Sequence, residues 1–169
     1  MSISSLFAGA ASGFIATVPM TIVMLLLHRL LPWLERYPLP PSRITARIAH
    51  RIGLRKRMSQ EQHLALTALA HFGYGATAGA VYAPIAASWH PAPLVGGIAF
   101  GLIVWLASYL GLLPALAVLP PATEHPARRN ALMIAAHIVW GATLGLLVDR
   151  LGGRRRGESQ PVSEARSRL

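Results

Sequence analysis

Residues 64–123 read LALTALAHFGYGATAGAVYAPIAASWHPAPLVGGIAFGLIVWLASYLGLLPALAVLPPAT, a run of 60 residues without an Asp, Glu, Lys or Arg. Helices of a soluble domain need a solvated polar face, so a run of this length is typical of membrane-embedded segments. As one helix it would extend about 90 Å, about three times the thickness of the hydrocarbon core. The run must therefore turn back, and Ser88-Trp89-His90-Pro91-Ala92-Pro93 predicts the turn, because its prolines cannot continue a helix.

The charged residues lie in clusters that flank such runs. The chain has 169 residues with 16 Lys and Arg against 6 Asp and Glu, a net charge of +10, yet residues 1–28 and 130–148 also lack all four types. In a soluble protein this balance would suggest a nucleic-acid partner. Because the charges border apolar segments instead, we expect a lipid bilayer as partner and no nucleic acid. The absence of cysteine excludes disulfides and cysteine-ligated metals.

The uncharged segments predict an all-α, polytopic membrane protein with a single domain over residues 1–152. About 20 apolar residues cross a bilayer as a helix, which places four spans near 6–31, 64–87, 94–113 and 130–150. We expect the fourth helix to stop at Gly152-Gly153. Residues 153–169 are rich in arginine and lack an apolar period, which predicts a disordered tail.

Two halves of the chain resemble each other. HFGYGATAG at 71–79 recurs as HIVWGATLG at 137–145, and an LP…LPP connector at 31–41 recurs at 113–121. Each copy contains two crossings, so both copies enter the membrane from the same side. The pattern predicts a tandem duplication, a parallel repeat with a pseudo-twofold axis along the membrane normal. Chance similarity among the residues common in membrane helices is the alternative.

Each span carries a GxxxG pair. In lipid, helices associate through close van der Waals contact, and glycines four residues apart leave a flat strip on one helix face. We therefore expect tight helix packing at Gly9, Gly13, Gly75, Gly79, Gly97, Gly101, Gly141 and Gly145.

His71 and His137 occupy equivalent positions in the two copies. Ionisable residues within a span default to a functional-site hypothesis. With a pseudo-twofold axis the two imidazoles would lie at similar depth, where they could ligate a b-type haem from both faces, hold a metal or relay protons. The structural alternative is a hydrogen bond across a helix interface. No third ligand accompanies them, so we expect no metal site and no cofactor, with haem b as the alternative. Tyr74 and Trp140, one turn along, are interpreted as packing or interfacial aromatics.

Catalysis has no support in the sequence. No span contains a carboxylate, and the GxSxG, HExxH and Walker motifs are missing. We therefore expect no enzyme, but a helix bundle with a structural, assembly or envelope-support role, partnered by a second copy or another membrane protein. The alternatives are a small transporter or channel acting as an oligomer, and a cofactor carrier that uses the two histidines.

The connector at 42–58 predicts a basic amphipathic helix. Ser42 is the expected N-cap of a helix over 43–57, in which isoleucines recur every fourth residue beside the arginines. Such a helix suits the headgroup layer and its anionic phospholipids, and an ordinary topogenic loop is the alternative. The arginines are Arg43, Arg47, Arg51 and Arg55.

Three short motifs resemble a known family. Pro38-Leu39-Pro40-Pro41, Leu119-Pro120-Pro121, and His137-x-x-Trp140 leading into Asp149-Arg150 are similar to the YagU-like family of small, uncharacterised bacterial inner-membrane proteins. The resemblance extends over all four spans in order. It implies a four-helix architecture in a bacterial inner membrane, and it implies no activity.

The distribution of basic residues predicts the orientation. With four spans, ten basic residues between Arg29 and Arg129 lie on one side and six from Arg150 onward lie on the other. The positive-inside rule then favours a cytoplasmic first connector with both termini outside. A dual-topology dimer or a miscounted span is the alternative explanation for basic residues on both sides. Alkaline phosphatase fused to the C-terminus should be active, because that reporter matures only in the periplasm. A fused reporter that works only in the cytoplasm would reverse the orientation.

Overall fold

The computed structural model describes residues 3–158, with side chains for residues 3–151, and this part of the chain is all-helical. Its long helices are α1 (Ile3–Arg29), α3 (Gln60–Trp89), α4 (Pro93–Leu106) and α6 (Ala127–Glu158). A π-helix, η3 (Ala107–Leu112), continues α4 into the short α5 (Leu113–Ala115), and 3-10 turns lie at Trp33–Glu35, Arg55–Arg57 and Ala122–Glu124.

Four helices are long and apolar enough to cross a membrane. They are Ile3–Arg29, Gln60–Trp89, Pro93–Ala115 and Ala127–Leu151. The expectation of an all-α fold with four spans is confirmed, with span ends that differ from the expected ones by a few residues. The turn expected at 88–93 is present between α3 and α4, where His90 takes a left-handed conformation with φ 49°.

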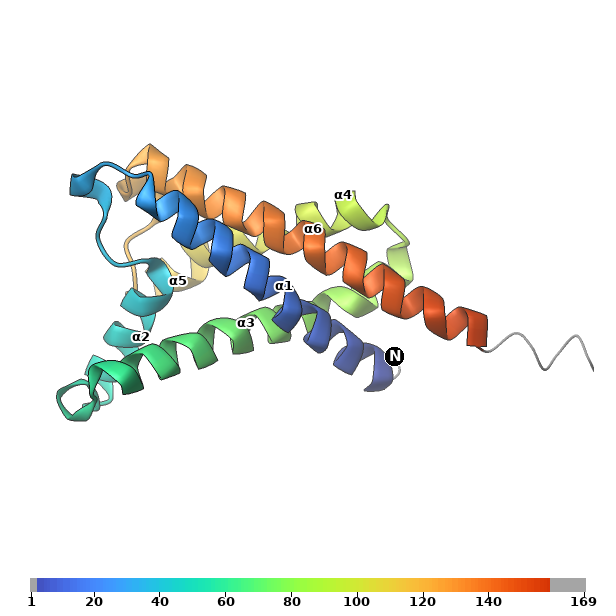
Figure 1. Ribbon diagram of the computed structural model, residues 1–169, viewed down its shortest axis with the longest axis horizontal. Helices are drawn as coiled ribbons and strands as arrows, with labels where there is room; N and C mark the ends of the chain where they lie inside the picture. Colours follow the sequence, from blue (N-terminus) through green and yellow to red (C-terminus); the bar gives the residue numbers. More distant parts are fainter. Residues whose placement is uncertain (1–2, 159–169) are drawn as a thin grey trace, which may run out of the picture.

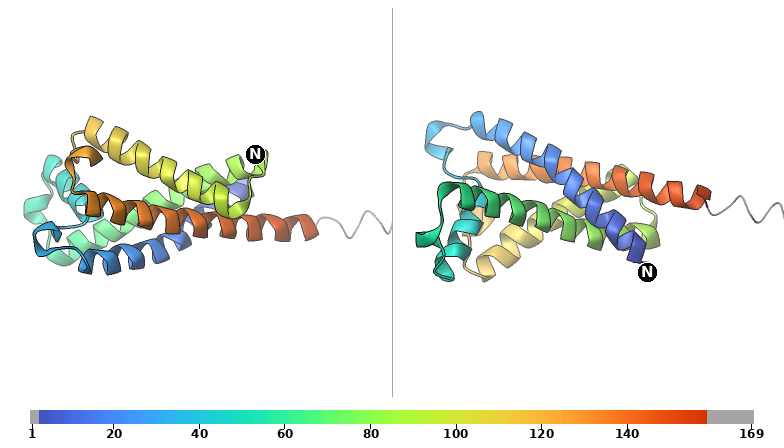
Figure 2. Two further views of the ribbon diagram at one scale, coloured as in Figure 1. Left: turned by 90° about the horizontal axis from the view of Figure 1, so that it is seen from above. Right: turned by 60° about the horizontal axis from the view of Figure 1, so that its bottom comes forward.

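The four spans alternate in direction between the two ends of the bundle. The start of α1 and the far end of α6 lie together at one end, and residues 30–59 and 116–126, which connect the spans, lie at the other (Figure 1). We call these the terminal end and the connector end. Two further views show the same arrangement, with α1 running alongside α6 in opposite directions (Figure 2).

Glycines hold α1 against α3. A Cβ atom built on Gly79 would lie 2.8 Å from the Cα of Gly13, and one built on Gly13 would collide with the carbonyl oxygen of Gly75. A Cβ atom on Gly9 would likewise collide with α3, at the carbonyl oxygen of Gly79. Only a residue without a side chain permits such an approach, and the backbones gain dense van der Waals contact that lipid does not provide.

The same kind of contact holds α4 against α6. A Cβ atom on Gly97 would lie 2.9 Å from the Cα of Gly145, and one on Gly101 would lie 3.2 Å from the Cα of Gly141. Each half of the chain therefore forms a helix pair through its own glycines. This arrangement is compatible with a duplication, which stays a prediction.

The two pairs are joined through α1 and α6. Ala16 and Ala136 are fully buried between the helices, and the indole Nε1–H of Trp140 donates to the carbonyl oxygen of Gly13 at 3.3 Å. A symmetric bundle would repeat this packing between α3 and α4. Those two helices touch far less than α1 and α6 do, so the bundle is open between them.

The connector helix differs from its expected bounds. The helix α2 spans Pro40–Arg51, with Leu39 at its N-cap, so the expected start after Ser42 is wrong. Proline at the first position suits a helix start because its missing N–H has no partner there. Ser42 instead hydrogen-bonds the Nε2 of His63 at 3.1 Å. Gly53, with φ 73°, follows the helix end, so Arg55 belongs to a separate 3-10 turn.

The last helix is longer than expected. Its helical backbone continues to Glu158, so the expected stop at Gly152-Gly153 is wrong. Glycine costs about 1 kcal/mol within a helix, which is too little to end one by itself. Residues 153–158, which were expected to belong to a disordered tail, are therefore helical, and residues 159–169 of that tail lie outside the described residues.

The glycine contact predicts a position-specific effect on stability. Gly79→Val should lower the apparent Tm of the purified protein in mild detergent by several degrees, because overpacking a tight contact costs about 1–3 kcal/mol. Gly73→Val is the matched control on the same helix, since a Cβ atom on Gly73 meets nothing within 4 Å. Equal destabilisation by both substitutions would contradict the packing.

Candidate functional site

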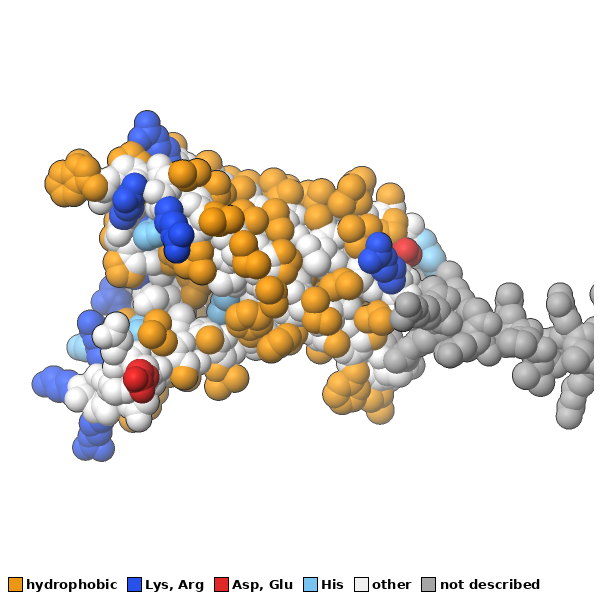
Figure 3. Space-filling view, in the orientation of Figure 1, with side chains coloured by type: hydrophobic (Ala, Val, Ile, Leu, Met, Phe, Trp, Pro, Cys, Tyr) orange, Lys and Arg blue, Asp and Glu red, His pale blue; other side chains and the backbone are white. Residues whose placement is uncertain are grey.

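A cavity of about 330 Å³ lies where α3 and α4 diverge, on the connector side of the glycine contacts. All four spans and α2 contribute to its wall, and Figure 3 shows a hollow in this face towards the connector end. The wall is mainly aliphatic and aromatic and contains no Asp, Glu, Lys or Arg among the described residues. Both histidines predicted as candidate site residues, His71 and His137, line it.

His137 is fixed in one tautomer by its own helix. Its Nδ1–H donates to the carbonyl oxygen of Met133 at 2.7 Å, and since a carbonyl only accepts, the proton of the neutral ring lies on Nδ1. The residue is 5% exposed, and its Nε2 has no hydrogen-bond partner among the described residues. The acceptor lone pair on its Nε2 is therefore not used by any described residue.

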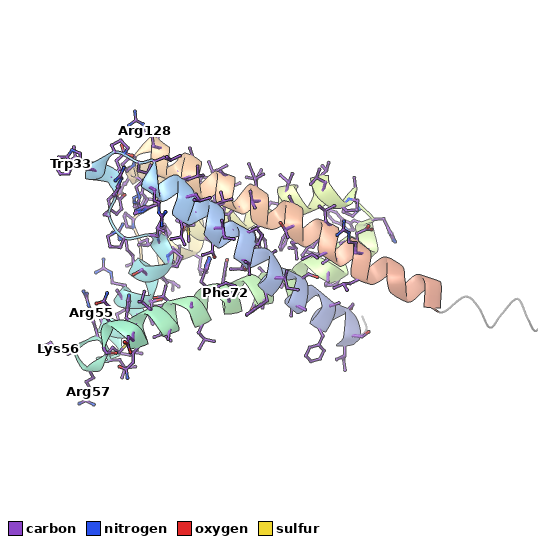
Figure 4. All side chains as sticks on the ribbon, viewed as in Figure 1. Trp33, Arg55, Lys56, Arg57, Phe72 and Arg128 are labelled. Atoms are coloured by element: carbon purple, nitrogen blue, oxygen red, sulfur yellow. The ribbon has the colours of Figure 1, made fainter. Side chains whose placement is uncertain are left out.

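His71 lies on the facing helix α3. Its Nε2 is buried and has no hydrogen-bond partner in the described part of the chain. The structure brings the two histidines to the wall of the same cavity. Neither ring makes the hydrogen bond across a helix interface that the structural alternative required. Beside His71, the ring of Phe72 contacts Phe14 of α1 at 4.9 Å between centroids (Figure 4).

The π-helix η3 supplies polar groups that the sequence reasoning missed. Ser108 and Tyr109 are both buried and both line the cavity. The wider π-turn accommodates one extra residue, and such turns occur often at functional sites. The hydroxyl of Tyr109 makes no hydrogen bond to a described residue, and its ring meets His137 edge-on at 6.1 Å. A signal was present: these are the only hydroxyl-bearing residues in the span expected at 94–113.

Tyr74 and Trp140, equivalent in the sequence repeat, have different partners. The Tyr74 hydroxyl hydrogen-bonds the Oγ of Ser108 at 2.8 Å across the gap between α3 and η3. Trp140 is 2% exposed and joins α6 to α1 by its hydrogen bond to the Gly13 carbonyl oxygen. Both line the cavity. The halves of the bundle are therefore not equivalent at this site.

The four connector arginines lie outside the cavity. Arg43 lies over the ring of Tyr37 at 5.3 Å, and Arg51 donates to the carbonyl oxygens of Leu116 and Ala117 at 2.7 and 3.0 Å. Arg51 thereby fastens α2 to the end of α5, where α2 covers one side of the cavity. Arg47 and Arg55 are exposed. The single amphipathic stripe expected from the sequence is therefore divided among different roles.

Arg129 was counted in the sequence only as a topological charge, but it is 5% exposed. Its guanidinium donates to the carbonyl oxygens of Glu35, Tyr37 and Pro38, at 2.7, 3.0 and 3.2 Å. It also lies 3.5 Å from the ring centroid of Tyr37. Arg129 thus ties the start of α6 to the first connector.

Comparison with family models assigns the chain to a family. Neither a curated protein nor a solved structure matches the chain. One family model, described as "Protein of unknown function (DUF1440)", matches residues 34–146, which include α2, α3, α4, η3 and most of α6. That description does not mention the YagU-like family, so the finer resemblance stays a prediction. The match covers about two thirds of the 169 residues, and the chain belongs to this family of unknown function.

Proposed function

We propose that the protein is a non-enzymatic membrane helix bundle that binds a compact, uncharged and mainly apolar molecule in its cavity. One observation carries this proposal: His71, His137 and Tyr109 line a mainly apolar cavity, and the Nε2 atoms of both histidines and the Tyr109 hydroxyl have no hydrogen-bond partner among the described residues. Buried polar groups are almost always paired, so unpaired ones at a cavity wall suggest that a ligand completes them.

The chemistry of the wall defines the ligand class. The volume of about 330 Å³ lies at the small end of the range of ligand sites, which is about 300–1,000 Å³. A wall without a charged side chain does not compensate the desolvation of an ion, which favours an uncharged ligand. The lone pair on His137 calls for an O–H or N–H group, so we propose a ligand with a polar end of this kind.

The packing also bears on the expected assembly role. All eight glycines of the GxxxG pairs are described, and each lies against another helix of the same chain or its backbone. They are therefore occupied within the bundle and do not offer a free face to a partner. A second copy or another membrane protein would have to bind through the exposed leucine, isoleucine and phenylalanine side chains instead.

A through-channel within one copy has less support than binding. Towards the terminal end, beyond the cavity, Gly9 approaches Gly79 and Gly97 approaches Gly145 closely enough to exclude a side chain. These contacts favour a cavity that fills from the connector half or from the lipid. We further propose that the chain is a duplicated unit in a bacterial inner membrane, with its basic connector end facing the cytoplasm.

Ligand binding is tested with 4-bromophenol, a compact apolar probe that carries one O–H group and quenches tryptophan fluorescence on contact. In a Trp33→Phe/Trp89→Phe/Trp105→Phe background, the remaining Trp140 lines the cavity. We expect saturable quenching of Trp140. Bromobenzene, which lacks the hydroxyl, should bind about tenfold more weakly, the effect of one hydrogen bond of about 1.4 kcal/mol.

A cavity-filling pair of variants completes this test. Val104→Phe places a ring in the cavity and should abolish saturable quenching, because Val104 lines the wall. Ile103→Phe adds the same ring on the neighbouring residue, which is 59% exposed and outside the wall, and should leave it intact. Quenching that rises linearly with probe, as in simple partitioning, in both variants and in the parent would refute the proposed function.

Haem b fits the cavity poorly. The wall offers no Arg or Lys for the two propionates, and the volume is small for a tetrapyrrole. Protein purified in mild detergent, with and without haem reconstitution, should therefore show no Soret band in its visible spectrum. A Soret band that disappears in a His71→Ala/His137→Ala variant would make the two histidines axial ligands.

A further inference from the structure

A second site lies at the connector end, apart from the cavity. We propose that a shallow groove of about 450 Å³ there binds the phosphate group of an anionic phospholipid, with Arg43 as the donor that recognises it. The groove is lined by Tyr37, Pro38, Arg43, Pro120 and His125, and we call it the basic groove. This inference goes beyond the proposed function and does not rest on it.

The positive charge of Arg129 lies next to the groove, at the ring of Tyr37. Its guanidinium lies at the Tyr37 ring and donates to three backbone carbonyls, and it forms no ion pair with a described carboxylate. Carbonyl dipoles stabilise the cation but leave its full positive charge in place. The charge of Glu35 favours this cation without an ion pair to it, so a buried positive charge remains beside the groove and would attract an anion there.

Arg43 supplies free donors at the wall of the groove. Its guanidinium lies 5.3 Å from the centroid of the Tyr37 ring and makes no hydrogen bond or ion pair with a described residue. The five N–H groups of arginine form a planar fork that matches two phosphate oxygens at once. This cation–π contact restricts the side chain before the anion arrives, which reduces the entropy lost on binding.

The pKa of His125 is affected by the positive charges near the groove. Its Nδ1 hydrogen-bonds the Tyr37 hydroxyl at 3.2 Å. Burial, followed by the charges of Arg43 and Arg129, lowers the pKa of His125, and the opposing effects of Glu124 and the Pro120 carbonyl are smaller. Burial disfavours a charge of either sign, but the effects of Arg43 and Arg129 show that the positive charges of both side chains extend to the groove, where they would attract an anion.

The surroundings favour a lipid as the source of the phosphate. Leu30, Trp33 and Leu34, beside the groove in sequence, are 79%, 79% and 71% exposed. A tryptophan at such a position is typical of the membrane interface, where phosphates lie. Figure 3 shows lysine and arginine side chains gathered at the connector end, next to apolar surface. Figure 4 shows Trp33 and Arg128 close together at this same end. A lipid would place its chains on the apolar surface and its phosphate in the groove.

The test compares Arg43→Gln with Arg47→Gln. Both remove one positive charge from α2, one turn apart, but Arg47 is exposed and does not line the groove. The full-length variants are placed in nanodiscs of phosphatidylcholine with a minor fraction of phosphatidylglycerol, and native mass spectrometry measures the two lipids retained on the protein. Equal elution volume and equal apparent Tm in lipid-free detergent establish that both variants fold.

We expect the wild type and Arg47→Gln to retain phosphatidylglycerol preferentially, and Arg43→Gln to lose about fivefold of that preference, as for one arginine near an anionic surface. Equal losses in both variants would reduce the effect to diffuse charge and overturn the proposal. Inorganic phosphate added in lipid-free detergent separates the two phosphate sources. If it raises the Tm of the wild type but not of Arg43→Gln, and the lipid preference is missing, the ligand is a soluble phosphate and the lipid assignment is wrong.

Discussion

The direct approach of one helix backbone to another at paired glycines is the contact on which the rest of the bundle depends. Lipid tails are as apolar as leucine side chains, so helices in a bilayer gain little from burying leucine and must gain from close fit. The pairs of α1 with α3 and of α4 with α6 obtain this fit from Gly13 against Gly79 and from Gly97 against Gly145. The pairs then share one further long interface, between α1 and α6. Since α3 and α4 have no such interface, the bundle keeps an opening between them, and the cavity lies in it.

The fold class was predictable because it follows from local properties. Uncharged runs of sufficient length predict helices that cross a bilayer, and prolines at 91 and 93 predict the turn between two of them. Helix ends were less predictable, because a serine that looks like an N-cap has other partners in three dimensions: Ser42 binds His63, and Pro40 starts the helix. Gly152 and Gly153 did not end α6, since their cost within a helix is small.

The candidate site was predictable only in part. The recurrence of histidine in two otherwise uncharged spans identified His71 and His137, and both line the cavity. Tyr109 and Arg129 gave weaker signals, because their roles depend on contacts between distant segments. Arg129 reaches backbone carbonyls more than 90 residues away in the sequence, and no local pattern specifies that. The sequence repeat also treats Tyr74 and Trp140 as equals, although one binds Ser108 and the other binds Gly13.

The hydrogen bond from Trp140 to Gly13 joins residues that are 127 positions apart. During synthesis, α1 and α3 are both complete, with the glycines that join them, before the second half of the chain is made. This helix pair can therefore form first. The wall of the cavity needs Met133, His137 and Trp140 from α6, and Arg129 at the start of the same helix fastens the first connector. A nascent chain that ends before α6 therefore has an inserted helix pair but neither the cavity nor a fixed connector. The cavity and the fixed first connector therefore both form only when the last helix inserts.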